Sequence, residues 1–189
     1  MDATPRTAMV LLLPAILLFG HETSPTDVVG LRPGIEVQGA ATPEELDLVR
    51  WAVGRYARAG LRLPFLEFSF HDEMSGCHDR LGFYLDGRID LCPGLLINLT
   101  THHTILHEMG HAWSEAALTP EDRARFMRMR HLETWDSWNV PWAERGWEQA
   151  ADIVAWALGD RVLMPTIPDN SPDQLAAAYE LLTGSPPPH

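Results

Sequence analysis

Residues 107–111 have the sequence His-Glu-Met-Gly-His, which places two imidazoles and a carboxylate within about one helical turn. In an α-helix, residues i and i+4 lie on the same face, so His107 and His111 can bind one metal ion together. Imidazole nitrogens are common zinc ligands, and a carboxylate beside the metal can accept a proton from a bound water. The spacing predicts a helical zinc site with Glu108 as the general base of a hydrolytic reaction.

A third metal ligand must come from another segment, because a catalytic zinc ion usually has three protein ligands and one water. The extended metzincin signature requires glycine and histidine where this chain has Ser114 and Ala117, so that class is excluded. Downstream, Glu148 and Asp152 are four residues apart in a helix-forming stretch. We expect Glu148 to bind the metal and Asp152 to orient a ligand histidine by a hydrogen bond.

Together, the His107-Glu108-x-x-His111 motif and the Glu148-x-x-x-Asp152 pair resemble the gluzincin zinc metallopeptidases, the thermolysin-like clan. The resemblance covers two helices, and it extends to small uncharacterised bacterial proteins with a His-Glu-x-x-His-Ala-Trp stretch. It implies one zinc ion, hydrolysis of peptide bonds and a minimal zincin-like fold. It also implies an edge strand, expected within residues 82–99, that aligns an extended peptide substrate.

Several residues have more than one interpretation at this stage. Glu144 is an alternative third ligand, although Gly146 makes the start of its helix uncertain. His102 and His103 are more consistent with structural or solvent-facing roles than with metal binding. His131 and Tyr179 are candidates for stabilising an oxyanion on chemical grounds alone. Core packing is the favoured role for the six tryptophans at 113, 135, 138, 142, 147 and 156, with a substrate cleft as the alternative, and the arginines at 123, 125, 128 and 130 are expected on the surface.

Two other functions are consistent with the same residues. One is a zinc hydrolase that acts on a non-peptide amide. The other is a non-catalytic protein with a structural zinc ion, which would need a fourth protein ligand such as Glu144 or His103. The net charge of -12 argues against a nucleic-acid partner, because phosphate binding requires a basic surface.

Hydrophobic periodicity and turn residues predict an α+β domain, in which a small sheet with a hairpin is followed by helices. The predicted strands are 65–71, 82–85 and 88–92, the last two joined by Asp86-Gly87, with a further short strand at 95–99. The predicted helices run from Thr42 to Gly60, over 102–117, 120–131 and 143–158, and from Ser171 to Gly184. A chain of 189 residues with 46% hydrophobic residues can form one such domain, which we place at 42–185.

The N-terminal residues favour export from a bacterial cell. Residues 8–19 form an apolar run of the length of a signal-peptide core, so we interpret 1–20 as a signal peptide or anchor and 21–41 as a linker or arm. A buried N-terminal helix is the alternative. In a secreted or envelope protein, Cys77 and Cys92 are expected to form a disulfide worth about 3 kcal/mol, whereas in the cytosol they would be free thiols.

Overall fold

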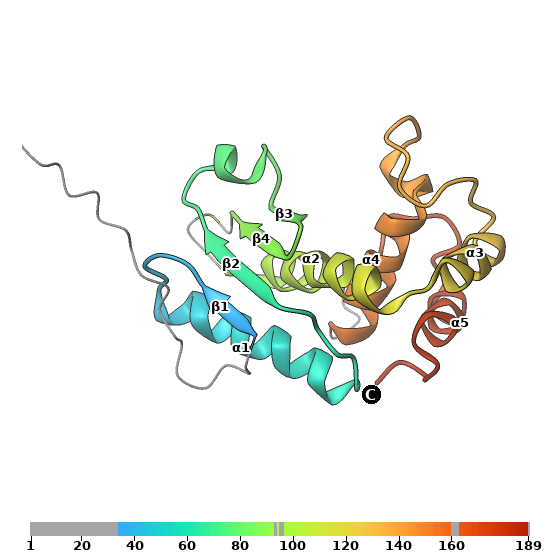
Figure 1. Ribbon diagram of the computed structural model, residues 1–189, viewed down its shortest axis with the longest axis horizontal. Helices are drawn as coiled ribbons and strands as arrows, with labels where there is room; N and C mark the ends of the chain where they lie inside the picture. The colour runs from blue at the N-terminus through green and yellow to red at the C-terminus, as the bar shows by residue number, and fades with distance from the viewer. Residues whose placement is uncertain (1–33, 93, 95–96, 160–162, 189) are drawn as a thin grey trace, which may run out of the picture.

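The computed structural model describes residues 34–92, 94, 97–159 and 163–188. They form the predicted α+β architecture, with the sheet and the first helix at one end, the third and fifth helices at the other, and the buried second and fourth helices between them (Figure 1). The expected signal peptide or anchor at 1–20 lies outside the described residues. Within the described part of the chain, no helix combines the length and the apolar character that a bilayer span requires.

The sheet has four strands in the order β1-β2-β4-β3. β1 (Ile35–Val37), β2 (Leu66–Phe70) and β4 (Arg88–Leu91) are parallel, and β3 (Gly82–Leu85) pairs antiparallel with β4. β3 is therefore an edge strand. Alternate side chains face the core, among them Val37, Leu66, Phe68, Ile89 and Leu91.

The local sequence predicted the β3–β4 hairpin correctly but missed the first strand of the sheet. Asp86 and Gly87 both have positive φ, as a tight hairpin turn between β3 and β4 requires. β1 was missed, because a three-residue strand is too short to show a period. It lies inside the segment 21–41 that we interpreted as a linker, so the ordered sheet begins before residue 42.

Three helices begin at the capping boxes that the sequence predicts, with a proline in the first turn. They are α1 (Pro43–Arg58), α3 (Pro120–Met129) and α5 (Pro172–Thr183). The prediction that Arg130, directly after α3, lies on the surface is wrong. It is buried and donates hydrogen bonds to the side chain of Gln149 and to the carbonyl oxygens of Pro168 and Asp169, so it ties α3 to neighbouring segments.

Helix α2 (Leu99–Ala117) begins earlier than predicted. The side chain of Asn98 accepts hydrogen bonds from the backbone N–H groups of Thr100 and Thr101, which fixes the first turn there. The predicted strand at 95–99 is therefore wrong at its C-terminal end, and residues 95–96 lie outside the described part. The local cap outweighs the short apolar run that suggested a strand.

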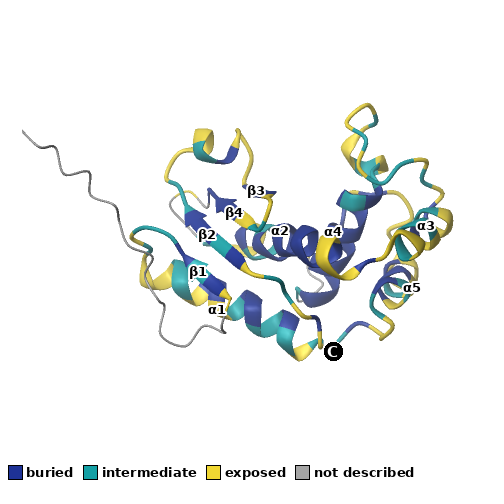
Figure 2. Ribbon diagram, in the orientation of Figure 1, coloured by how far each residue is buried: buried dark blue, intermediate teal, exposed yellow. Residues whose placement is uncertain are grey.

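Helices α2 and α4 (Gly146–Leu158) form the most extensive helix–helix contact of the described structure, and both are buried for most of their length (Figure 2). Gly110 makes this approach possible. A Cβ atom built there would lie 2.9 Å from the Cα and 3.1 Å from the carbonyl oxygen of Ala151. Backbone atoms cannot yield as a flexible side chain can, so glycine is required where the helices cross.

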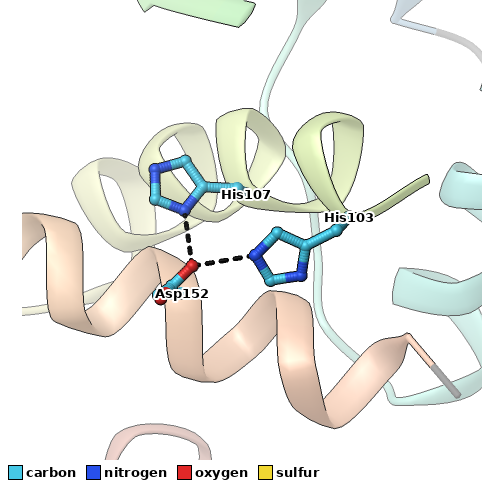
Figure 3. Close-up of side chains that lie close together, drawn as sticks. All are labelled: His103, His107 and Asp152. Atoms are coloured by element: carbon cyan, nitrogen blue, oxygen red, sulfur yellow. Dashed lines mark hydrogen bonds and ion pairs between the residues drawn. The ribbon is translucent and has the colours of Figure 1, made fainter. Parts of the chain in front are cut away.

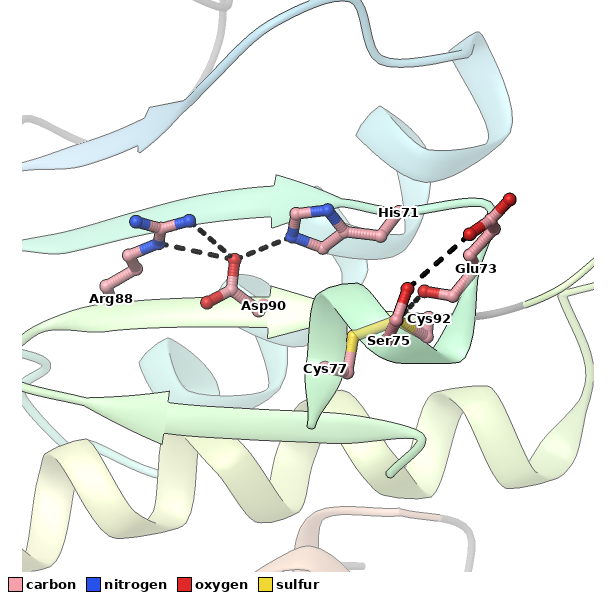
Figure 4. The surroundings of a disulfide bond; sticks show 7 residues. All are labelled: His71, Glu73, Ser75, Cys77, Arg88, Asp90 and Cys92. Carbon is pink, nitrogen blue, oxygen red and sulfur yellow. Dashed lines mark hydrogen bonds and ion pairs between the residues drawn. A yellow bond between two sulfur atoms is a disulfide. The ribbon is translucent and has the colours of Figure 1, made fainter. Parts of the chain in front are cut away.

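The predicted disulfide joins Cys77, at the end of the 3-10 turn Met74–Cys77, to Cys92, directly after β4 (Figure 4). Beside it, Asp90 accepts hydrogen bonds from Arg88 and lies 2.7 Å from Nε2 of His71. The disulfide and this polar network hold the segment that leads into β3. They thereby position one wall of the cleft described below.

We predict that Gly110→Ala lowers the free energy of unfolding, measured by urea denaturation, by up to about 2 kcal/mol. Overpacking costs about 1–3 kcal/mol, which exceeds the gain of about 1 kcal/mol in helix propensity. Gly54→Ala on α1 is the matched control, since a Cβ there meets only the end of the Arg58 side chain at 3.3 Å. Equal effects of the two substitutions would contradict the proposed role of Gly110.

Candidate metal centre

Three of the predicted site residues converge between α2 and α4. His107 and His111 project from successive turns of α2, and both are buried, with their ring centroids 4.6 Å apart. Glu148 projects from α4, and its Oε2 lies 3.3 Å from Nε2 of His107 and 3.2 Å from Nε2 of His111. Residues separated by about 40 positions thus place three potential ligand atoms around one point.

These separations are compatible with a shared metal ion as well as with hydrogen bonds. Donor atoms at zinc–ligand distances of about 2.0–2.1 Å in a tetrahedron lie about 3.3 Å apart. Charge-assisted hydrogen bonds are shorter, about 2.7–2.9 Å. One oxygen of Glu148 lies at nearly equal distance from two imidazole nitrogens, so the three donors are placed where they could share one ion.

Asp152 contacts the other nitrogen of His107, as the sequence predicts. Its Oδ1 lies 3.3 Å from Nδ1 of His107 and 2.9 Å from Nε2 of His103 (Figure 3). The carboxylate of Asp152 can therefore fix the tautomer of His107 with Nε2 directed at Glu148. His103 has a structural role that the sequence left open, since its imidazole bonds to Asp152 rather than pointing at Glu148.

A fourth protein ligand is not found among the described residues. The histidine and carboxylate groups that could share an ion are His107, His111 and Glu148, and a second set of His103, His107 and Asp152. The 2.9 Å contact in the second set is that of a hydrogen bond. Glu144 lies exposed in the 3-10 turn Trp142–Glu144, before α4 begins, so it does not share a face with Glu148. The first set therefore offers three ligand atoms, and the described residues supply no fourth.

Burial and hydrogen bonding shift the pKa values of the three ligand groups in different directions. Burial lowers the pKa of His107, but hydrogen bonds to Asp152 and Glu148 outweigh it and raise that pKa to about 10. Burial lowers the pKa of His111 to about 4. Burial raises the pKa of Glu148, but hydrogen bonds from both histidines hold it well below its usual range. Without a metal, the site therefore holds an imidazolium at His107 and a carboxylate at Glu148 near neutral pH.

Glu108 occupies a separate position on the cleft side of α2. It is buried against Gly82 of β3, where an added Cβ would lie 2.8 Å from Cγ of Glu108, and it accepts a hydrogen bond from the backbone N–H of Tyr84. Burial raises the pKa of Glu108 to about 7, although the charges of His107 and Arg80 oppose the shift. A group with this pKa can both accept and donate a proton near neutral pH.

A cleft of about 670 Å³ opens over these residues. Arg80 and the backbone of β3 line one wall, and α2 supplies the floor. Tryptophans and residues 163–166 line the opposite wall, with Trp147 4.6 Å from the His111 ring and Trp142 5.9 Å from the His107 ring, measured between centroids.

The favoured core interpretation of the tryptophans is right for some of them and wrong for others. Trp113 and Trp156 are buried in the core, and Trp135 packs against it. Trp147 also packs against the core, although it contributes to the cleft as well, whereas Trp138 and Trp142 line the cleft. The sequence does not separate these groups, since Trp135, which packs against the core, and Trp138, which lines the cleft, lie three residues apart in the same loop.

The two oxyanion candidates are corrected. Tyr179 is buried on α5, where burial raises its pKa, and His131 lies beyond the end of α3; neither lines the cleft. The groups that sequence reasoning missed are Tyr84, whose hydroxyl lies 2.5 Å from Glu115, and Arg80. Arg80 lies just before β3 and Tyr84 lies within it. No spacing rule predicts that either residue lies near the His107–His111 motif, so the sequence held no signal for their place in the cleft.

Comparisons with protein-family models, with curated protein sequences and with solved structures find no match to this chain. The resemblance to gluzincins therefore rests on the two motifs and on the arrangement of their side chains.

We predict that the purified protein binds one zinc ion per chain, measured by atomic absorption after dialysis. Glu148→Ala removes one of three ligands and should abolish stoichiometric zinc. Asp152→Ala removes the contact with His107 and should weaken zinc affinity about 10- to 100-fold. Glu144→Ala is the control, because the exposed Glu144 should leave zinc content unchanged. Zinc loss in Glu144→Ala and not in Glu148→Ala would reverse the assignment.

Zinc binding should release at least one proton at pH 7. The folded-state pKa of His107 is about 10, so its imidazole is protonated at this pH and must lose that proton to bind a metal. Calorimetric titrations in buffers of different ionisation enthalpy measure the number of protons released. We also expect the apparent affinity to rise about tenfold per pH unit between pH 6 and 8. A binding enthalpy independent of the buffer would contradict this account.

Proposed function

We propose that this protein is a zinc-dependent metallopeptidase. The observation that carries the proposal is the convergence of His107, His111 and Glu148. Nε2 of each histidine lies 3.2–3.3 Å from Oε2 of Glu148, in a cleft that Glu108 also lines. A zinc ion held there would lower the pKa of a water molecule and polarise a substrate carbonyl.

The residues of the chain have distinct tasks in this proposal. Glu108 takes a proton from the water molecule while the water oxygen attacks the carbonyl carbon of the substrate. When the carbon–nitrogen bond breaks, Glu108 passes that proton to the departing amine. Asp152 holds His107 in the required tautomer. The raised pKa of Glu108, about 7, suits a group that must take up and then release a proton.

The peptide as substrate is supported by the edge strand beside the site. β3 is an edge strand whose residues line the cleft, so an extended peptide could align along its unpaired edge. The expected edge strand within 82–99 thus corresponds to β3. Exposed apolar side chains at the rim, such as Leu85 and Met164, can contact the side chains of such a peptide.

The alternatives are less well supported. A structural zinc ion would need a fourth protein ligand, which the described residues do not supply, and would not need a cleft. A non-peptide amide uses the same centre, but it would not need an edge strand. The disulfide between Cys77 and Cys92 favours an oxidising compartment, which supports export from the cell.

Glu108→Gln should keep the zinc content of the wild type and lower the kcat of peptide hydrolysis about 10²- to 10⁴-fold, because the amide cannot accept the proton. The assay measures cleavage of a mixed peptide library by mass spectrometry, with Glu44→Gln on α1 as the exposed control. Full activity in Glu108→Gln would exclude the proposed base. Absence of cleavage by the zinc-loaded wild type would exclude peptides as the substrate.

A further inference from the structure

Arg80 places a positive charge in the cleft of a strongly acidic protein. The chain has a net charge of -12, and Arg80 is the one arginine or lysine among the described residues that line the cleft. It lies two residues before β3, and its backbone N–H donates to the carbonyl oxygen of Cys77 at 3.0 Å. Glu108 lines the same cleft, and the charge of Arg80 lowers its pKa.

Aromatic side chains hold the guanidinium of Arg80 from both walls of the cleft. Its Cζ lies 5.9 Å from the ring centroid of Phe83 and 5.7 Å from that of Trp138. Trp138 is in turn contacted by Arg145, at 4.6 Å, and Arg145 donates two hydrogen bonds to the carbonyl oxygen of Val140. Cation–π contacts of this kind restrain the orientation of the guanidinium and leave its N–H groups available.

The N–H groups of this guanidinium have no acceptor in the part of the chain that the structure describes. The buried Arg130 differs, because it donates to one side chain and two carbonyl oxygens. A guanidinium has a planar fork of donors whose geometry matches a carboxylate. The guanidinium of Arg80 is exposed, contacts two aromatic rings and has no acceptor among the described residues. It is therefore suited to bind a ligand that enters the cleft.

We propose that Arg80 binds a carboxylate of the substrate, so that the protein prefers peptides with a free carboxylate near the bond that is cleaved. This inference rests on the proposed peptidase function and deepens it. The carboxylate belongs to the C-terminus of the peptide or to an aspartate or glutamate side chain. Apolar side chains at the rim, Leu81, Leu85, Leu163 and Met164, contact the apolar part of the same substrate.

The test compares three N-acetylated tetrapeptides that share their first residues. The first ends in Phe-Leu with a free carboxylate, the second is its C-terminal amide, and the third is an amide with Glu in place of Leu. We expect wild-type kcat/KM to be about 10- to 100-fold higher for one of the two charged peptides than for the neutral amide, as for a charge-assisted hydrogen bond. Which charged peptide is preferred distinguishes a terminal from a side-chain carboxylate.

Arg80→Ala should abolish this preference, because kcat/KM falls about 10- to 100-fold for the preferred charged peptide and much less for the neutral amide. Arg80→Lys keeps the charge without the fork and should retain part of the preference. Arg128→Ala, an exposed arginine on α3, is the matched control and should retain all of it. Zinc content and thermal melting verify that each variant is folded.

Two results would overturn the inference. One is equal kcat/KM for all three peptides in the wild type. The other is an equal loss on charged and neutral peptides in Arg80→Ala, which would assign Arg80 to the reacting carbonyl or to the pKa of Glu108 instead.

If no peptide is cleaved, the proposed function fails, but the carboxylate preference can still be measured as binding. Zinc-loaded Glu108→Gln, titrated with the same peptides and followed by tryptophan fluorescence, should bind a charged peptide more tightly than the amide. Adding Arg80→Ala should remove that difference. Equal binding, or no binding of any peptide, would count against a carboxylate site at Arg80.

Discussion

The close approach of α2 and α4 at Gly110 and Ala151 is the contact on which the candidate metal centre depends. A glutamate side chain is short, and Glu148 contacts both histidines only because the two helix backbones almost touch one turn away. Any side chain at position 110 would separate the helices and move the carboxylate away from the imidazoles. A glycine that is unfavourable for an isolated helix is therefore favourable in this packed pair.

The same packing sets the electrostatics of the site. Carboxylates are expensive to bury, and Glu148 and Asp152 are tolerated because histidines face both of them. Glu108 faces the cleft, where burial is the largest influence and raises its pKa to about 7. Two kinds of glutamate thus lie within one site. Glu148 is held ionised by the two histidines, whereas the pKa of Glu108 lies near neutrality.

The cleft joins parts of the chain that are far apart in sequence. One wall is β3, held by the hairpin and by the disulfide that precedes it, and the other is the tryptophan-rich segment before α4. The contacts of Arg80 and Arg145 with Trp138 connect the two walls. The segment that separates the two sequence motifs therefore contributes to the site, since its tryptophans Trp138, Trp142 and Trp147 line the cleft.

The sequence alone determined what depends on neighbouring residues: the helix caps, the hairpin turn, and the spacing that puts His107 and His111 on one face. It also predicted Glu148 and Asp152 as partners, because their own spacing resembles a known pattern. Only the tertiary structure decided that His103 bonds to Asp152, that Arg130 is buried and that Arg80 enters the cleft. Each of these depends on which segments pack together, and no local period or cap encodes contacts between residues so far apart along the chain.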